Sequence, residues 1–434
     1  MDKMADVLGR AGAWCGQNKY LSAIKNAFQN FMPLTIAGAI GVLWCNVLVN
    51  DQTGLGLFFK PIMALDFLNP AFQAVNFCTI SCITVGITLG IAQEIGVWNM
   101  GAERAGYIPG LVGLAAWLSV TNTSHMVDGA KEAFTGVAGN ELGATGLFTG
   151  MIIGVLSVEL FCFFEKQDAL KIKMPDQVPP GVARAFEVLV PATITLIITA
   201  CIGSACYNLT GLYLNDVIKN GIQGPLGAVG ATIPGVMIIY LVIMLFWLVG
   251  IHGNNMLSAV KEALFTPLAL ENVEAFNKHQ TPKNIINMYA LQMWGEFGGS
   301  GVTIGLVIAI MIFSKREDNK AIATLSLVPG LFNINETVTF GIPMVLNPIL
   351  GIPFVVAPLI TIIIGYVLTV IGFCPVACLT VPWTCPPIVF GFLACGANVM
   401  GAVTQAILIV VSTVIYVPFL ISYEKYQNKQ AAEA

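Results

Sequence analysis

Long apolar stretches separated by short polar segments recur along the whole chain. Each stretch is close to the roughly 20 residues that an α-helix needs to cross the hydrocarbon core of a bilayer. The pattern predicts an all-α polytopic membrane protein with about ten transmembrane helices. These are expected at residues 28–50, 70–93, 106–122, 143–165, 185–210, 228–251, 297–314, 352–373, 386–400 and 402–422.

Two segments in the C-terminal half interrupt this pattern. Residues 253–270 are too short and too polar for a clean span. Residues 326–350 place two amides and a carboxylate between apolar runs, with Gly330 and Gly341 on either side. Irregular backbone at membrane depth is tolerated only where it is buried in protein or lines a water-filled cavity. Both segments are therefore predicted to be re-entrant hairpins, a pattern that marks the binding site in transporters.

The contrast between the two halves predicts three parts. Residues 1–211 have long, mostly uninterrupted apolar runs and are expected to form an N-terminal dimerisation or scaffold domain. Residues 212–227 are amphipathic and Gly-rich at their end, which is typical of a linker on the membrane surface. Residues 228–434 mix apolar runs with Gly, Pro, Asn, His, Glu and Trp, and are expected to form the transport domain that handles the cargo.

Composition and charge narrow the class of protein. Of 434 residues, 56% are hydrophobic and 10% are charged, and the mean hydropathy is +0.80. About a quarter of the residues of a soluble domain are charged, which places this chain in the membrane. The net charge of −4 gives no basic surface for nucleic acid. The 11 Cys lie mostly in apolar runs without zinc-site spacing, so no metal or cofactor is expected.

Lys and Arg in short loops predict the orientation, because they are enriched on the cytoplasmic side. Basic residues precede the first span, fill the 166–184 loop and follow the seventh span, whereas the 51–69 and 123–142 loops carry one Lys each. The N-terminus and the 166–184 loop are therefore expected in the cytoplasm. An even number of crossings would bring the C-terminus to the same side.

Glu336 and His252 are the candidate reactive residues. An ionisable side chain at membrane depth is costly and normally faces a cavity or a partner, so Glu336 marks a functional site. We expect its carboxylate to be held in an enclosed, poorly solvated pocket. His252 ends a long apolar run and is followed at once by Gly253 and Asn254. A neutral imidazole can hold a hydroxyl or move a proton near physiological pH.

Trp247 and Trp383 indicate a carbohydrate ligand. A Trp ring packs against the apolar C–H face of a pyranose, while amides and carboxylates bind its hydroxyls. An equally favoured alternative places both side chains in the aromatic belt at the membrane surface, where Trp is enriched. The belt is the preferred interpretation for Trp44, Trp98 and Trp117.

The segments Asn333–Glu336 and Gly341–Pro348 form the most specific motif of the chain. Further motifs lie at residues 23–28, 32–38, 142–148, 250–253, 266–272 and 298–301. Together they cover most of the sequence. In these motifs the chain resembles the membrane-embedded IIC component of the bacterial phosphotransferase system, in the lactose/cellobiose/N,N′-diacetylchitobiose family.

The resemblance implies an elevator-type transporter with about ten transmembrane helices and two re-entrant hairpins. The protein would be a homodimer in the bacterial cytoplasmic membrane, with an N-terminal dimerisation domain and a C-terminal domain that carries sugar by rigid-body motion. The phosphoryl donor would be a phosphocysteine on a separate cytoplasmic IIB protein, which is supplied in turn by IIA.

The resemblance also implies roles for individual residues. By motif position, Glu336 and His252 would flank the 6-hydroxyl of the sugar. Asn335 and Asn140 would be hydrogen-bond partners. The remaining predicted substrate-binding residues are the ring-stacking Trp247 and Trp383, together with Asn333, Asn254 and Gly253.

These expectations combine into import of a β-linked disaccharide coupled to phosphorylation of its 6-hydroxyl. The chain would be the permease part of a protein-phosphocysteine–sugar phosphotransferase. The alternative is a proton-coupled secondary sugar transporter, in which Glu336 and His252 form a proton relay. Cellobiose, lactose, diacetylchitobiose and aryl β-glucosides are all candidate substrates.

Overall fold

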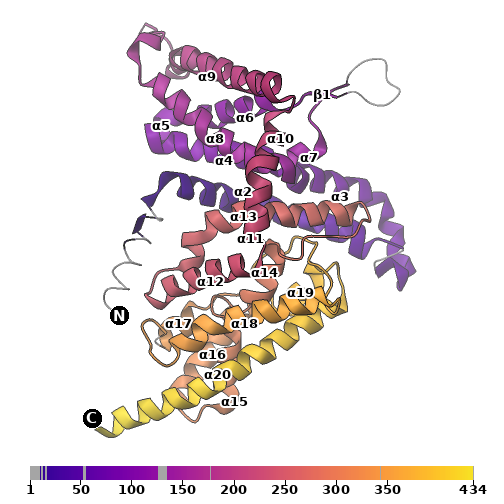
Figure 1. The fold of residues 1–434 in the computed structure, drawn as a ribbon, viewed down its shortest axis with the longest axis vertical. Helices are drawn as coiled ribbons and strands as arrows, with labels where there is room; N and C mark the ends of the chain where they lie inside the picture. The colour runs from indigo at the N-terminus through magenta and orange to yellow at the C-terminus, as the bar shows by residue number, and fades with distance from the viewer. Residues whose placement is uncertain are drawn as a thin grey trace. The chain divides into compact units, whose positions relative to one another are not determined.

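The structure is a computed structural model that describes residues 10, 13–14, 17–51, 55–125, 134–175, 177–342 and 344–433. Within these ranges regular structure is almost entirely helical, and the strands are the short antiparallel pair β1 (Ser124–His125) and β2 (Phe134–Thr135) (Figure 1).

The chain divides into two compact units. The N-terminal unit contains Gln17–Gly38 and Gln73–Gly227, and the C-terminal unit contains Ala39–Phe72 and Ala228–Ala434. Residues 39–72 thus group with the C-terminal residues, which the sequence pattern did not indicate. The roles assigned to the predicted domains 1–211, 212–227 and 228–434 stay predictions.

The N-terminal unit is a bundle of long and short helices. Its longest helix, α9, has Pro180 in its first turn and stops before Gly211, which has a φ of 71°. Proline is preorganised for a first helical turn and glycine for a left-handed end, so this helix is delimited by its sequence. The elements of the unit include α4 (Ile83–Met100), α5 (Ala102–Ala105), α6 (Ile108–Val120), α7 (Gly139–Leu142), α8 (Ala144–Glu165), the 3-10 turn η5 (Asp168–Leu170), α9 (Pro180–Thr210), α10 (Leu214–Ile218) and the π-helical turn η6 (Lys219–Gln223).

Small residues let α4, α6 and α8 pack closely in this unit. A Cβ atom at Gly113 would lie 2.3 Å from the Cβ of Ala92, and one at Gly150 would lie 2.2 Å from the hydroxyl of Thr88. Interfaces between membrane helices favour such residues because close backbone approach maximises dispersion contacts. Trp117 is fully buried in this core, so the prediction that it belongs to an interfacial belt is wrong.

The C-terminal unit is built around a long helix, α20 (Val399–Glu433), which is the yellow helix of Figure 1. Helices α15, α18 and α19 pack on α20, while α12 packs on α13 and α18. The other elements of this unit are the π-helical turn η1 (Trp44–Leu48), the 3-10 segments η2 (Leu55–Leu57) and η3 (Lys60–Leu68), α12 (Ile233–Leu248), α13 (Gly253–Asn277), α14 (Met288–Gly295), α15 (Ile304–Phe313), α16 (Glu317–Leu331), α17 (Glu336–Gly341), α18 (Gly351–Val370) and α19 (Val389–Ala394).

The boundaries between the two units fall inside three helices. They are α2 (Lys19–Leu43), α3 (Asn69–Asn76) and α11 (Gly224–Gly230). The π-helical turn η4 (Phe77–Ser81) follows α3 and leads into α4.

The apolar stretches form helices, but fewer than ten are long enough to span. Among the described residues, five helices are long and apolar enough to cross a membrane, and a sixth candidate is the pair Lys60–Ser81 and Ile83–Met100, bent by 42°. Three further apolar helices are shorter, namely Ile108–Val120, Ile233–Leu248 and Ile304–Phe313. The protein is therefore an all-helical membrane protein, and the predicted number of spans stays a prediction.

The two interrupted segments differ from each other. Residues 253–270 lie in the continuous 25-residue helix α13, so a hairpin inside this segment is wrong. Residues 326–350 are broken as predicted: α16 ends at Leu331, four residues intervene, and the short helix α17 begins at Glu336. The candidate polar side chains of residues 253–270 therefore lie at the start of a helix. Those of residues 326–350 lie at a break between two helices.

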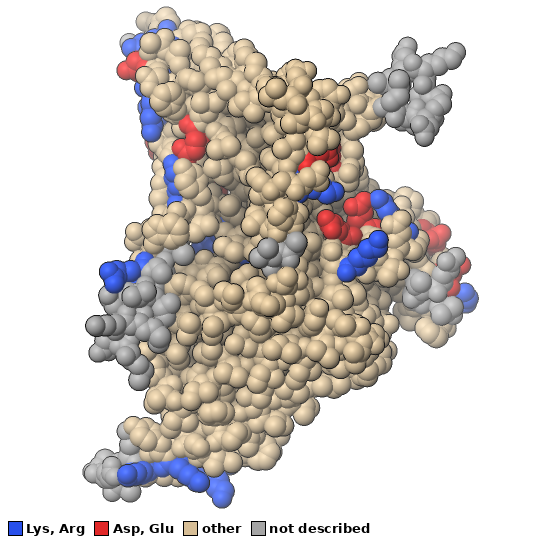
Figure 2. Space-filling view, viewed as in Figure 1, with Lys and Arg blue, Asp and Glu red and all other residues tan. Residues whose placement is uncertain are grey.

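Charged side chains occupy little of the visible surface. Figure 2 shows broad areas without Lys, Arg, Asp or Glu, and the charged side chains gather in small groups. A surface of this kind is suited to lipid, because an uncompensated charge is costly in hydrocarbon.

The close approach of α15 and α20 generates a stability prediction. A Cβ at Gly305 would lie 2.8 Å from both the carbonyl carbon of Ser412 and the backbone nitrogen of Thr413. Overpacking a well-filled interface typically costs about 1–3 kcal/mol. We therefore expect Gly305→Ala to lower the thermal unfolding midpoint in detergent. Gly181→Ala is the control, because a Cβ there meets nothing within 4 Å, and an equal loss in both variants would contradict the prediction.

Candidate functional site

A glycine-rich turn between α14 and α15 forms the base of the site. Gly298, Gly299 and Gly301 have φ values of 70°, 88° and 80°, a region that glycine enters without a Cβ penalty. Space also requires glycine, since a Cβ at Gly299 would lie 2.6 Å from the Cγ of Asn335. The turn therefore packs directly against the non-helical segment 332–335 that precedes α17.

Asn335 joins the break to this turn. It is buried, and its side-chain amide donates to the backbone carbonyl of Ser300 at 2.7 Å. Its own carbonyl accepts from the N–H of Thr339 at 2.9 Å, which starts α17. Asn335 thus fixes the position from which Glu336 leaves the backbone.

Asn333 ties three segments together. Its φ of 62° is in the left-handed region, which Asn tolerates better than most residues. Its Oδ1 accepts from the N–H of Gly298 at 2.6 Å, and its Nδ2 donates to the carbonyls of Trp383 and Cys385, the latter at 3.2 Å. These hydrogen bonds use both Oδ1 and Nδ2 of Asn333. In this conformation the side chain holds the three segments of the site together, whereas the sequence predicted that it contacts the sugar.

His252 caps the N-terminus of α13. Its Nδ1 accepts from the backbone N–H of Asn255 at 3.2 Å. A neutral imidazole has one donor and one acceptor nitrogen, so this bond leaves the proton on Nε2. The ring is therefore oriented to donate from Nε2 to a second group.

Trp247 packs against the ring of His252. Its ring is 2% exposed, lies 4.4 Å from the His252 ring between centroids, and meets Phe354 edge-on at 6.4 Å. In this conformation it has no free face for a sugar, contrary to the predicted stacking. Trp383 differs, because its side chain is 43% exposed. It is the ring that is open for stacking.

Glu336 is the first residue of α17 and its side chain is exposed. The expected dry enclosure is not formed around it by the described residues. Its carboxylate is nevertheless close enough to act electrostatically on the His252 ring, as are the charges of Glu296 and Lys261. Both residues belong to the C-terminal unit, and their joint contact with a sugar stays a prediction.

A buried ion pair stands beside His252. The ammonium of Lys261 contacts the carboxylate of Glu296, with the two side chains 7% and 16% exposed. The hydroxyl of Tyr240 donates to the same carboxylate at 2.7 Å, and the ammonium lies 5.6 Å from the centre of the Tyr240 ring. These contacts join α12, α13 and the start of the glycine-rich turn.

The sequence did not single out Lys261, Glu296 or Tyr240 as parts of the site. Lys261 was visible only as a charge in an apolar region, and Glu296 stands just before the Gly298–Gly301 motif. The detectable signal was the presence of two opposite charges within apolar sequence. Their pairing depends on tertiary contact across 35 positions, which no local pattern shows.

Asn254 and Gly253 lie at the start of α13. Asn254 donates from Nδ2 to the hydroxyl of Ser300 at 3.2 Å, and its Oδ1 is buried without a partner among the described residues. A Cβ at Gly253 would lie 2.0 Å from the carbonyl oxygen of Ile243. Asn254 keeps a free acceptor for a ligand, and Gly253 allows α13 to approach α12.

Asn140 belongs to the N-terminal unit. It lies in the short helix α7 with an exposed side chain, while the neighbouring Glu141 is buried. Its contact with a sugar stays a prediction. Over the part of the chain that the structure describes, no group of three or more His, Cys, Asp and Glu side chains could hold a metal ion.

Comparisons with known proteins give a consistent result. A family model described as "Phosphotransferase system, EIIC" matches residues 25–358. The oligo-beta-mannoside-specific EIIC component of Bacillus subtilis (strain 168) is 32% identical over 429 residues, covering 98% of this chain and 94% of that protein. The cellobiose-specific EIIC component of Lactococcus lactis subsp. lactis (strain IL1403) is 30% identical, covering 98% of both.

A solved structure extends this likeness to three dimensions. The transporter ChbC, the IIC component from the N,N′-diacetylchitobiose-specific phosphotransferase system, has a TM-score of 0.88 at 29% sequence identity. The likeness covers 97% of each chain.

The buried ion pair leads to a stability prediction. Removing one partner of a buried pair leaves an uncompensated charge and typically costs about 3–5 kcal/mol. We therefore expect Lys261→Met to lower the unfolding midpoint strongly. The double variant Lys261→Met/Glu296→Gln should recover much of the loss, because the introduced side-chain amide is neutral and its oxygen can still accept from Tyr240.

The control is an exposed pair of the same charges. Lys278 and Glu274 are spaced i, i+4 with side chains 60% and 41% exposed. Such surface pairs are worth about 0.5 kcal/mol or less, so Lys278→Met should change the midpoint little. Similar losses in Lys261→Met and Lys278→Met would refute the importance of the buried pair.

Proposed function

The chain belongs to the EIIC family of the phosphotransferase system, and we propose that it imports a β-linked disaccharide while the 6-hydroxyl is phosphorylated. It is a multi-pass membrane protein of this bacterial system, in which EIIC works with IIB. As a family member it is a sugar permease of the cellobiose, lactose and related β-glycoside type.

One observation carries the chemical proposal. The bond from the N–H of Asn255 to Nδ1 of His252 leaves the ring proton on Nε2, and the exposed carboxylate of Glu336 acts electrostatically on the same ring. We infer that a proton donor and a carboxylate from two different segments face the same ligand. This is the arrangement needed to hold a hydroxyl and to accept its proton.

The proposed step is transfer of a phosphoryl group from a phosphocysteine of IIB. The 6-hydroxyl oxygen attacks phosphorus, an O–P bond forms, and the S–P bond breaks with release of the cysteine thiolate. Glu336 accepts the hydroxyl proton, and His252 orients the hydroxyl through Nε2. Enzymes accelerate phosphoryl transfer mainly by positioning and electrostatics, and the rigid support of His252 by Trp247 serves that purpose.

The remaining contacts support a pyranose ligand. Trp383 offers an exposed ring for the C–H face of a sugar ring, and Asn254 keeps a buried free acceptor for a hydroxyl. The relatives are named for oligo-beta-mannoside, cellobiose and N,N′-diacetylchitobiose, all built of β-linked units. This supports a β-linked disaccharide as the substrate class.

We further propose a homodimer in which the C-terminal unit carries the sugar by an elevator-type motion. The N- and C-termini would lie in the cytoplasm, where phosphorylation adds charge and traps the product. Support comes from the likeness to ChbC over 97% of the chain and from the location of Glu336, His252 and Trp383 in one compact unit.

A substitution at Glu336 tests the role as base. Glu336→Gln keeps the size of the side chain but cannot accept the hydroxyl proton. We expect sugar phosphorylation by phosphorylated IIB to fall by at least about 100-fold, the usual size of a general-base effect, while sugar binding is retained. The assay is formation of sugar phosphate by the purified variant in liposomes.

The control is Glu103→Gln, which removes the same charge from an exposed position in the N-terminal unit. It should phosphorylate sugar at the rate of the unchanged protein. Full phosphorylation in Glu336→Gln would exclude Glu336 as the base. Loss of both binding and phosphorylation would assign it to sugar recognition instead.

Transport in proteoliposomes separates group translocation from proton symport. We expect sugar to accumulate only when IIB and a phosphoryl source are enclosed, and to appear inside as sugar phosphate. Accumulation of unmodified sugar driven by a pH gradient alone would favour the proton relay. Empty liposomes with the same enclosed components provide the background.

A further inference from the structure

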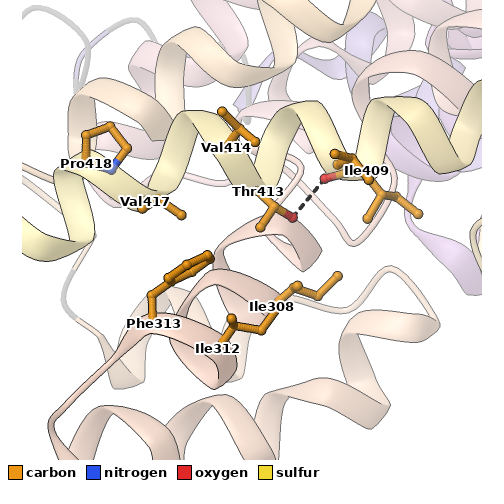
Figure 3. A pocket seen from close by; sticks show the side chains of 9 residues that line it. Ile308, Ile312, Phe313, Ile409, Thr413, Val414, Val417 and Pro418 are labelled. Atoms are coloured by element: carbon orange, nitrogen blue, oxygen red, sulfur yellow. Dashed lines mark hydrogen bonds between the residues drawn. The ribbon is translucent and has the colours of Figure 1, made fainter.

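An apolar groove runs along the outside of the C-terminal unit. It lies between α15 and α20 and has a volume of about 650 Å³ (Figure 3). Its walls are formed by side chains of both helices, namely Ile308, Ile312, Phe313, Ile409, Val410, Thr413, Val414, Val417 and Pro418.

The lining of the groove is almost entirely apolar. Thr413 is the polar residue of the lining, and its hydroxyl donates to the carbonyl of Ile409 at 2.9 Å, as Figure 3 shows. Ile312 and Val414, from opposite walls, are both 64% exposed. The lining therefore favours an apolar occupant, and in a bilayer acyl chains are abundant apolar groups.

Both helices run in the same direction along the groove. Tyr416 of α20 donates to the carbonyl of Gly301 at 2.8 Å, just before α15 begins. The hydroxyl of Ser314, just after α15 ends, contacts the carboxylate of Glu424 further along α20. The end of α15 therefore lies beside Glu424 in the last third of α20.

Basic side chains stand at this end. Lys315 follows the groove residue Phe313 by two positions, and Lys425 follows Pro418 by seven positions, about 10 Å along a helix. Both side chains are exposed and form no ion pair with any residue that the structure describes. Figure 2 shows a group of basic side chains at the C-terminal end of the chain.

The neighbouring charges are already engaged. Arg316 pairs with Asp318 and donates to Asn428 at 2.7 Å, and Lys320 pairs with Glu317 at 3.2 Å. Glu424 is buried and accepts from Ser314, from Asn319 at 3.1 Å and from the backbone N–H of Lys315 at 3.2 Å. The ammonium groups of Lys315 and Lys425 thus remain without an ion-pair partner among the described residues, close to the end of α15.

We propose that this groove binds one acyl chain of an anionic phospholipid, with the lipid phosphate between Lys315 and Lys425. Basic groups at a helix end attract anionic headgroups, and long Lys side chains reach the headgroup level while the helix stays in hydrocarbon. The chain fills the groove, and the negative charge satisfies ammonium groups that lack a protein partner. The bound lipid would brace α15 against α20 next to the glycine-rich turn of the sugar site.

The test compares lipids on the purified, delipidated full chain. We expect phosphatidylglycerol to raise the thermal unfolding midpoint by several degrees more than phosphatidylcholine with the same acyl chains. Native mass spectrometry should show one retained phosphatidylglycerol per chain. Equal stabilisation by the two lipids would mean an unselective lipid layer and would overturn the proposal.

Two variants separate headgroup from chain. Lys315→Gln/Lys425→Gln should weaken phosphatidylglycerol binding by about tenfold or more, since each Lys near the surface contributes to anionic lipid binding. Val414→Trp fills the groove and should abolish retention of either lipid at this site. Neither substitution touches the candidate sugar site, so sugar binding checks that both variants are folded.

Matched controls use charges and apolar residues elsewhere. Lys166→Gln/Lys173→Gln removes two exposed charges from the 166–184 loop, and Ile238→Trp enlarges a 63% exposed side chain on α12. Both should bind phosphatidylglycerol as the unchanged protein does. Equal losses in controls and groove variants would overturn the proposal, as would a change of oligomer mass in Val414→Trp, which would assign the groove to a second copy of the chain.

Discussion

The candidate site depends on the need of irregular backbone to find hydrogen-bond partners inside the protein. Backbone polar groups in hydrocarbon have no water to bond with, so a broken helix must be completed by other segments. Here the break before α17 and the glycine-rich turn before α15 complete each other, through the bond from Asn335 to Ser300 and the bond from Gly298 to Asn333. Glu336 follows this segment directly, as the first residue of α17.

This arrangement divides the polar residues into two groups. Asn333, Asn335 and the Lys261–Glu296 pair use their polar atoms within the protein, and they fix the geometry. Glu336, Nε2 of His252 and the free Oδ1 of Asn254 keep capacity for a ligand. The ligand-facing groups depend on the residues that fix the geometry, because a misplacement of a reacting group by about 1 Å can remove much of a catalytic effect.

The sequence predicted the parts of this site that depend on local composition. A carboxylate between apolar runs identified Glu336, and the flanking glycines predicted the break that the structure has at 332–335. Partner choice was not predictable in this way. Trp247 and Trp383 have equal status in the sequence, yet packing against Phe354 buries one and leaves the other exposed. Residues 253–270 looked too polar for a helix at membrane depth, but Lys261 is neutralised by Glu296 and the helix is continuous.

The three hydrogen bonds of Asn333 have a bearing on redesign of selectivity. One side chain fastens the loop segment that carries Trp383 to the turn that receives Asn335. Grafting a different loop to accept a bulkier saccharide would therefore succeed only if the new loop presents carbonyls at the same two positions. The loop that carries Trp383 and the turn at Gly298 therefore have to be exchanged together. Substitutions meant to change sugar selectivity should be made at residues that leave the hydrogen bonds of Asn333 intact.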